Sequence, residues 1–162
     1  MDHSDIEILK RQEDALRFER FTRRDALALG SLMVERGAGL GLVVACSIRL
    51  ASGAVVYQYL PDGTNLLNDL WMARKLRTVL TWESSSLRAA LETEEKGEVL
   101  LDHGLDVRDY ALCGGGFPIR LTGSHDVLGA VIASNLDHIA DHEFVVGALR
   151  EFLDVEVPSF AG

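Results

Sequence analysis

The β-branched residues of this sequence gather in two pairs of neighbouring segments, and this pairing limits the possible folds more than any other feature. The first pair, "LVVACSIRL" (42–50) and "AVVYQYL" (54–60), is joined by a tight turn at 51–53. The second pair, "FPIRL" (117–121) and "DVLGAVIASN" (126–135), is separated only by "TGSH". Consecutive strands joined by such short turns pair antiparallel. The sequence therefore predicts two β-hairpins.

Helical patterns fill the stretches around these hairpins. The predicted helices are 4–16, 22–36, 68–82, 84–97 and 137–153. The resulting order, helix, helix, strand, strand, helix, helix, strand, strand, helix, requires the long helices to cover the faces of the sheet. The predicted fold class is α+β, an antiparallel sheet of two hairpins flanked by helices.

Several helix ends carry recognisable signals. Thr22 and Asp25 have the spacing of a capping box, and Gly37 and Gly39 are expected to stop the helix that follows. The helix 84–97 is expected to be capped by Ser84 or Ser85. Residues 98–112 carry no clear pattern and are predicted to form a loop with a short turn.

The chain has 162 residues, which suits one domain, 1–162, with 1–16 as a peripheral N-terminal helix. Its formal net charge of −9 disfavours nucleic acid as a partner. The mixed charges of the first twenty residues do not resemble a secretory signal, and no apolar run is long enough to span a membrane. We therefore expect a cytoplasmic protein without membrane contact, whose Cys46 and Cys113 are thiols.

The last predicted helix carries the first candidate site. His138, Asp141 and His142 fall on the same side as the apolar residues of this helix, which is an unusual place for polar groups. Histidines four residues apart can share a metal, but no third ligand is evident, and we predict no metal site. Two interpretations stay open: the group forms the wall of a site, or Asp141 stabilises the helix N-terminus while His142 makes one hydrogen bond at the edge of the core.

The second candidate is the helix "NDLWMARKLRTV", where Lys75 lies beside Trp71 on the seam between the buried and exposed faces. Its ammonium would reach the edge of a pocket and attract an anion, or its stem would simply cover Trp71 within a solvated basic face. The three serines 84–86 are similarly divided between capping a helix and donating hydroxyl groups to a ligand.

The third candidate is "CGGGFPI", residues 113–119. The bare backbone of the three glycines 114–116 could present N–H groups to a carboxylate or phosphate, or it could allow close packing of a helix or subunit. The spacing matches neither a dinucleotide fingerprint nor a P-loop. Cys113 is either a reactive thiol or a buried one.

Taken together, "DALALG", "NDLWMARKLRTV", "SSSL", "GGGFPI" and "DHEFVVGALREFL" resemble one branch of the heme-degrading-domain-like family, to which GlcG, HbpS and the C-terminal domain of PduO belong. The resemblance implies a profilin-like sheet, assembly as dimers or larger rings, and heme binding or degradation in some relatives. It carries over to Asn68, Arg74, Lys75, Ser85, Ser86, Gly114, Gly115, Asp141 and His142. Ser84 and Cys113 stand where the family pattern has histidines, and Asn135 where it has a glycine, so iron ligation by those histidines is in question here.

These observations lead to one principal prediction and two alternatives. The chain is predicted to be a homo-oligomeric domain that binds a small anionic molecule, without turnover. The predicted ligand-binding residues are Asn68, Arg74, Lys75, Ser85, Ser86, Gly114, Gly115, Gly116, Asp141 and His142. The alternatives are a protein that binds or degrades heme or another tetrapyrrole, the only cofactor the resemblance suggests, and a structural component of a larger assembly.

Overall fold

The computed structural model describes residues 3–160, and a four-stranded antiparallel sheet forms its centre. The strands are ordered β2-β1-β4-β3, and their bounds are Ala45–Leu50 for β1, Val55–Tyr59 for β2, Gly116–Ile119 for β3 and Gly129–Ser134 for β4. β1 pairs with β2 and β3 pairs with β4, so both predicted hairpins are confirmed. The hairpins join through β1 and β4, with Ala45 opposite Ser134. The α+β fold class, an antiparallel sheet with helices, is as predicted.

The connection between β3 and β4 is longer than the predicted turn. β3 ends at Ile119, whose carbonyl accepts the Leu128 N–H at 2.8 Å, and the residues that follow pair through their outer edge with the chain before α2: the Phe18 N–H donates to the carbonyl of Arg120 at 2.9 Å, and the Thr122 N–H donates to the carbonyl of Phe18 at 2.9 Å. The pairing with β4 therefore lies within Gly129–Ser134 rather than 126–135.

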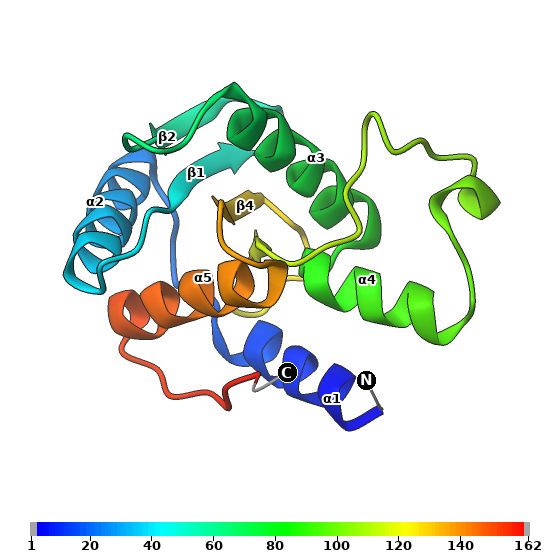
Figure 1. Cartoon of the computed structure of the whole chain (residues 1–162). Coiled ribbons are helices and arrows are strands. Elements are labelled where there is room, and N and C mark those ends of the chain that lie inside the picture. Colours follow the sequence, from blue (N-terminus) through cyan, green and yellow to red (C-terminus); the bar gives the residue numbers. More distant parts are fainter. Residues whose placement is uncertain (1–2, 161–162) are drawn as a thin grey trace.

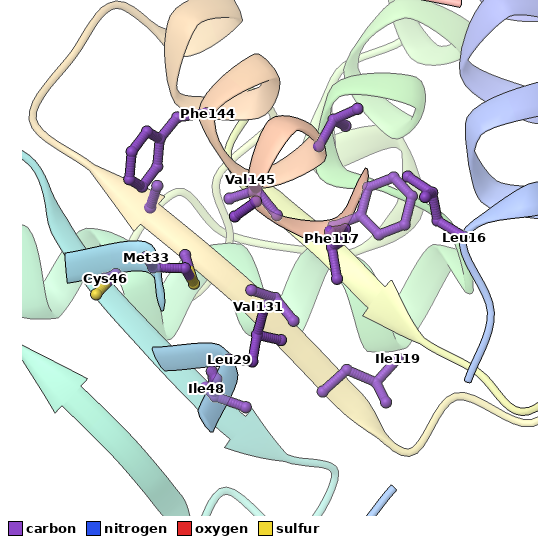
Figure 2. Close-up of a cluster of buried hydrophobic side chains, with 14 of the residues drawn as sticks. Leu16, Leu29, Met33, Cys46, Ile48, Phe117, Ile119, Val131, Phe144 and Val145 are labelled. Carbon is purple, nitrogen blue, oxygen red and sulfur yellow. The ribbon is translucent and has the colours of Figure 1, made fainter. Parts of the chain in front are cut away.

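Helices cover both faces of the sheet (Figure 1). On one face lie α2 (Arg23–Gly39) and α5 (His138–Leu153), and on the other lies α3 (Leu66–Trp82). Figure 2 shows the first face, where Met33 of α2, Val145 of α5 and Val131 of β4 meet with other apolar side chains in the main core. The smaller core on the opposite face is built from residues such as Met72 and Ile132. Burial of these side chains fixes α3 and α5 on opposite faces of the sheet. Polar groups of the two helices, Lys75 and Asp141, meet near the end of β4.

Several helix ends differ from prediction by one to three residues, and the second predicted helix after the first hairpin, 84–97, is shorter at both ends, Ser86–Glu95. α3 begins at Leu66 because Asn65 caps it: the Asn65 side chain accepts the Leu67 N–H at 3.0 Å. α2 continues to Gly39, so the expected stop at Gly37 is wrong. Gly37 is buried inside the helix, where an added Cβ would lie 3.1 Å from Val44 Cγ1. The capping box at the start of α2 is confirmed.

The remaining helices are α1 (His3–Ala15), α4 (Ser86–Glu95) and the short 3-10 helix η1 (Leu100–His103). α1 lies at the rim of the molecule (Figure 1), but its inner face is buried with α4 and the C-terminal segment, through residues such as Leu9 and Leu87. Within the described part of the chain, no helix is both long and apolar enough to cross a membrane.

Candidate ligand-binding site

A buried ion pair joins α3 to α5. Lys75 Nζ donates to Asp141 Oδ2 at 3.0 Å and to the carbonyl oxygen of Ala133, at the end of β4, at 2.8 Å. Both Lys75 and Asp141 are only 2% exposed. Lys75 lies one turn after Met72 on the buried side of α3, so the predicted position of Lys75 on the seam between the buried and exposed faces is wrong.

Burial and charge act in opposite directions on the carboxyl group of this pair. Burial raises the pKa of Asp141, and the adjacent Lys75 charge and the Leu136 N–H lower it, with burial dominating. The second carboxylate oxygen, Oδ1, accepts that N–H at 3.0 Å. Both oxygens of Asp141 are therefore satisfied inside the protein.

The glycines 114–116 form the third side of this junction, and their lack of side chains is a packing requirement. Gly115 has φ +126°, and an added Cβ would lie 2.6 Å from Lys75 Nζ. At Gly116 an added Cβ would lie 2.8 Å from Val79 Cγ2. Side chains here would push α3 away from β3 and break the contacts of the ion pair.

The glycine backbone is not a free anion-binding array, contrary to one of the two interpretations above. The Gly114 N–H donates to His138 Nδ1 at 3.1 Å, and the Gly116 N–H donates to Ser86 Oγ at 2.9 Å. The glycines thus hold the starts of α5 and α4 against the sheet, and their contribution to binding is indirect.

A polar cavity of about 580 Å³ opens beside the Lys75–Asp141 pair. Its wall comes from the start of α3, the end of β4, the start of α5 and the segment just before the glycines. The residues of the wall are Asn65, Leu67, Asn68, Trp71, Lys75, Leu112, Cys113, Ser134, Asn135, Leu136, His138 and Asp141. We call this space the polar cavity; of the predicted ligand-binding residues, it brings together Asn68, Lys75 and Asp141.

The side-chain acceptors of the polar cavity are already hydrogen-bonded within the protein. Asn68 is central to this network, because its amide donates to Ser134 Oγ at 3.2 Å and to Asn135 Oδ1 at 3.4 Å. The remaining acceptors and their donors are Asn65 Oδ1 with the Leu67 N–H, Asn68 Oδ1 with the Asn65 N–H, His138 Nδ1 with the Gly114 N–H, and Asp141 with Lys75 and Leu136.

Donors, by contrast, remain available in the wall. His138 Nδ1 accepts a hydrogen bond, so the neutral ring carries its proton on Nε2. The ammonium of Lys75 has three protons and two acceptors. Several donors of this wall have no acceptor among residues 3–160. They include the third Lys75 N–H, the His138 Nε2–H, the Ser134 hydroxyl, the Asn65 side-chain amide, the Trp71 indole N–H and the Cys113 thiol. The wall is therefore rich in donors and poor in free acceptors.

A second, larger cavity of about 800 Å³ adjoins the polar one, between α3, α4 and the segment 98–113. The two share Trp71, Leu112, Cys113 and His138. Arg74 belongs to this second space, which we call the apolar cavity: its guanidinium lies 4.0 Å from the centre of the Trp71 ring. The segment 98–112 was predicted as a loop with a short turn. It contains the short helix η1, and its last part contacts α3, where the Thr78 hydroxyl donates to the carbonyl of Ala111 at 2.8 Å.

His142 does not reach either cavity, although it was predicted to bind ligand. It is 1% exposed, and its Nε2 pairs with Gln12 Oε1 of α1 at 2.7 Å. Burial lowers the pKa of His142 to about 3, so it is neutral. The interpretation of this histidine as a core residue with one hydrogen bond agrees with its position.

The predicted serines also serve structure rather than the cavity. Ser85 caps α4, accepting the Arg88 N–H at 3.2 Å, and its hydroxyl lies 3.1 Å from a carboxylate oxygen of buried Glu13. Ser86 is occupied by the backbone of Gly116. Ser85, Ser86 and His142 together tie α1, α4 and α5 to the back of the junction.

Some residues of the polar cavity were not among the predicted ligand-binding residues. Asn65 and Ser134 stand at the ends of a helix and a strand, and both signals were present in the sequence as an Asx residue before a helix and a polar end to an apolar strand. His138 and Cys113 were considered as candidates and do line the cavity. Across residues 3–160, no three His, Cys, Asp or Glu side chains gather as a metal site.

The antiparallel sheet, its helical covering and the cavity at the α3–α5 junction define a profilin-like α+β domain. The sequence model described as "Haem degrading protein HbpS-like" matches residues 21–150. The chain belongs to this HbpS-like family, as its sequence motifs indicated.

Relatives and solved structures agree with this membership. The chain is 38% identical over 150 residues to a UPF0303 protein of Rhizobium etli, covering 93% of this chain and 90% of the relative. It is 40% identical over 146 residues to a UPF0303 protein of Streptomyces coelicolor, covering 90% of this chain and 91% of the relative. The crystal structure of the Ybr137w protein superposes with a TM-score of 0.80 at 27% identity, covering 92% of this chain and 88% of that one. A PduOC:heme complex shares the fold, with a TM-score of 0.67 at 19% identity over 86% of this chain and 97% of that one.

Proposed function

We propose that this chain binds a small anionic molecule in the polar cavity, in the cytoplasm and without turnover. The observation that supports this proposal is the excess of free hydrogen-bond donors in the wall. A ligand that supplies acceptors, such as a carboxylate or phosphate, would pair with these donors, whereas a donor-rich ligand would find the wall's acceptors occupied. The Lys75–Asp141 pair is internally balanced, so recognition rests on directed donors rather than on one free cation.

The state of the two nucleophile candidates in the wall supports the proposal of binding without turnover. Burial raises the pKa of the Cys113 thiol, which keeps it protonated. Ser134 Oγ accepts a hydrogen bond from the amide of Asn68, which cannot act as a base. Neither side chain is activated for attack on a ligand.

The proposal is tested with His138, the cavity donor that can be removed with the least effect on folding because it is exposed. Titration calorimetry with a panel of small carboxylates and phosphates should find at least one ligand, and His138→Ala should weaken it about tenfold. His125→Ala, an exposed histidine on the β3–β4 connection, is the matched control and should bind normally. Absence of binding across the panel, or equal affinities for the two variants, would refute the assignment of this cavity.

Heme is the second candidate, because the chain belongs to the HbpS-like family and a PduOC:heme complex has the same fold. The histidines and the cysteine at the α3–α5 junction do not offer a free axial ligand for iron in one copy of the chain. His138 Nδ1 is engaged and its Nε2 carries the proton; His142 is buried against Gln12; the Cys113 thiol is kept protonated by burial. We therefore expect that hemin titration of the wild type gives no Soret shift that depends on Cys113 and His138. A shift that depends on them would be present in the wild type and lost in both Cys113→Ser and His138→Ala. Such a shift would favour the heme function over the one proposed here.

We also propose that the chain forms homo-oligomers, as its family resemblance implies. The first turns of α3 expose Leu66, Leu67 and Leu70, and β2 is an edge strand of the sheet. A second copy covering these groups would lie next to the polar cavity. Light scattering should give a mass above that of one chain, and Leu66→Ser combined with Leu70→Ser should reduce it. A monomeric wild type would refute this part.

A further inference from the structure

We propose that the ligand is amphipathic: an anionic head lies in the polar cavity and an apolar body extends into the apolar cavity. This inference rests on the function proposed above and specifies its ligand. The two spaces share part of their wall, including Trp71 and Leu112, so one molecule can occupy both.

The wall of the apolar cavity carries large apolar side chains that the protein itself leaves open to solvent. Leu101 is 80% exposed, Val107 is 68% exposed and Val99 is 59% exposed. Exposed apolar side chains gathered around a hollow, rather than scattered singly, are typical of a binding surface. A ligand with an apolar body would cover them.

The charges of the two spaces orient this ligand. The acidic side chains Glu94, Glu98 and Asp106 line only the apolar cavity, so a carboxylate placed there would be repelled. In the polar cavity the carboxylate Asp141 is neutralised by Lys75, and free donors surround the space. The anionic head therefore belongs in the polar cavity.

Arg74 is the basic side chain in the wall of the apolar cavity. Its guanidinium stacks on Trp71, a residue of both walls, and donates to the carbonyl of Val107 at 3.3 Å. Among residues 3–160, no carboxylate forms an ion pair with it. Because Arg74 lines only the apolar cavity, its charge offsets part of the repulsion by the acidic side chains there, and the orientation of the ligand rests on the free donors of the polar cavity.

Three probes separate the two parts of this ligand. Phenylbutyrate has a head and a body, butyrate keeps only the head, and phenylbutyramide keeps the body without the charge. In calorimetric titrations, phenylbutyrate should bind at least about tenfold more tightly than either of the others, because each lacks one set of contacts.

Variants then assign the body to the apolar cavity. Val107→Asp changes an exposed residue of that wall, so it should fold normally, and it should weaken phenylbutyrate about tenfold while leaving butyrate unchanged. Leu27→Asp, at a half-exposed leucine of α2 that lines neither cavity, is the matched control and should change neither affinity.

The possible outcomes distinguish the inference from the function on which it rests. Equal affinities for butyrate and phenylbutyrate, both lost in His138→Ala, would overturn the amphipathic ligand and keep the anion-binding function. Equal affinities for phenylbutyrate and its amide would overturn both, as would the absence of binding by all three probes. A Val107→Asp variant that binds phenylbutyrate like the wild type would place the body elsewhere and refute the inference.

Discussion

Acid should destabilise this fold through His142, and the size of the effect follows from its burial. The pKa of this histidine is about 3 in the folded protein against 6.5 for an ordinary histidine, because burial disfavours the charged ring. Between these values the unfolded chain binds a proton that the folded chain does not bind. The free energy of unfolding therefore falls with decreasing pH by up to about 1.4 kcal/mol per pH unit. From about pH 7 to about pH 5 the contribution of His142 is a loss of about 2 kcal/mol.

The measurement is urea unfolding of the wild type and His142→Gln at these two pH values. The substitution keeps an N–H donor for Gln12 and removes the titration. Buried carboxyl groups such as Glu13 and Glu143 have raised pKa values and act in the opposite direction, so the comparison uses the difference between the two proteins. The wild type should lose about 2 kcal/mol more than the variant. His125→Gln, which changes an exposed histidine, should behave as the wild type, and equal pH dependence of wild type and His142→Gln would refute the reasoning.

Three further predictions concern stability and are measured by the same unfolding experiment. Gly115→Ala should lower the free energy of unfolding by about 3 kcal/mol or more, because its Cβ would lie 2.6 Å from Lys75 Nζ at a φ of +126°. Gly123→Ala, with φ +80° and no atom near, is the control and should lower it by about 1 kcal/mol. Similar losses in the two variants would contradict the packing argument. Lys75→Met should lower the free energy of unfolding by about 3–5 kcal/mol, because it leaves a buried carboxylate unpaired. Adding Asp141→Asn should recover part of that loss, and a larger loss in the double variant would contradict the pairing. Thr22→Ala should cost about 1 kcal/mol by removing the cap of α2, and no loss would show that the cap is not stabilising.

The sheet and its helices could be predicted from the sequence because their signals are local. Two β-branched segments around a short turn specify a hairpin, and the helical spacing of residues such as Met72 and Val79 specifies a buried face. The end of β3 could not be predicted in this way, because Phe18, far away in the sequence, pairs with the outer edge of the residues that follow Ile119.

The candidate site was only partly predictable, because its key contacts are long-range. Lys75 and Asp141 are 66 positions apart, and periodicity alone placed the lysine on a seam instead of in the interior. The glycines allowed two interpretations from sequence, and only the positions of Lys75 and Val79 show that close packing is the reason for their bare backbone. The predicted list therefore mixed residues of the cavity wall with residues that support the wall from behind.

Contacts join the Lys75–Asp141 ion pair to the glycines 114–116 and to the start of α5. In the function proposed above, this arrangement lets a buried lysine support the binding site although its charge is neutralised by Asp141. The bare backbone at Gly115 leaves room for Lys75 Nζ beneath β4, where it neutralises Asp141. Because both oxygens of Asp141 accept hydrogen bonds within the protein, this carboxylate is not a free acceptor that would repel an anion. The Gly114 N–H donates to His138 Nδ1, which leaves the ring proton on Nε2. If the polar cavity binds the anion proposed above, its selectivity depends on the buried network behind it, and we expect changes in that network to alter which ligand binds before they alter the shape of the cavity.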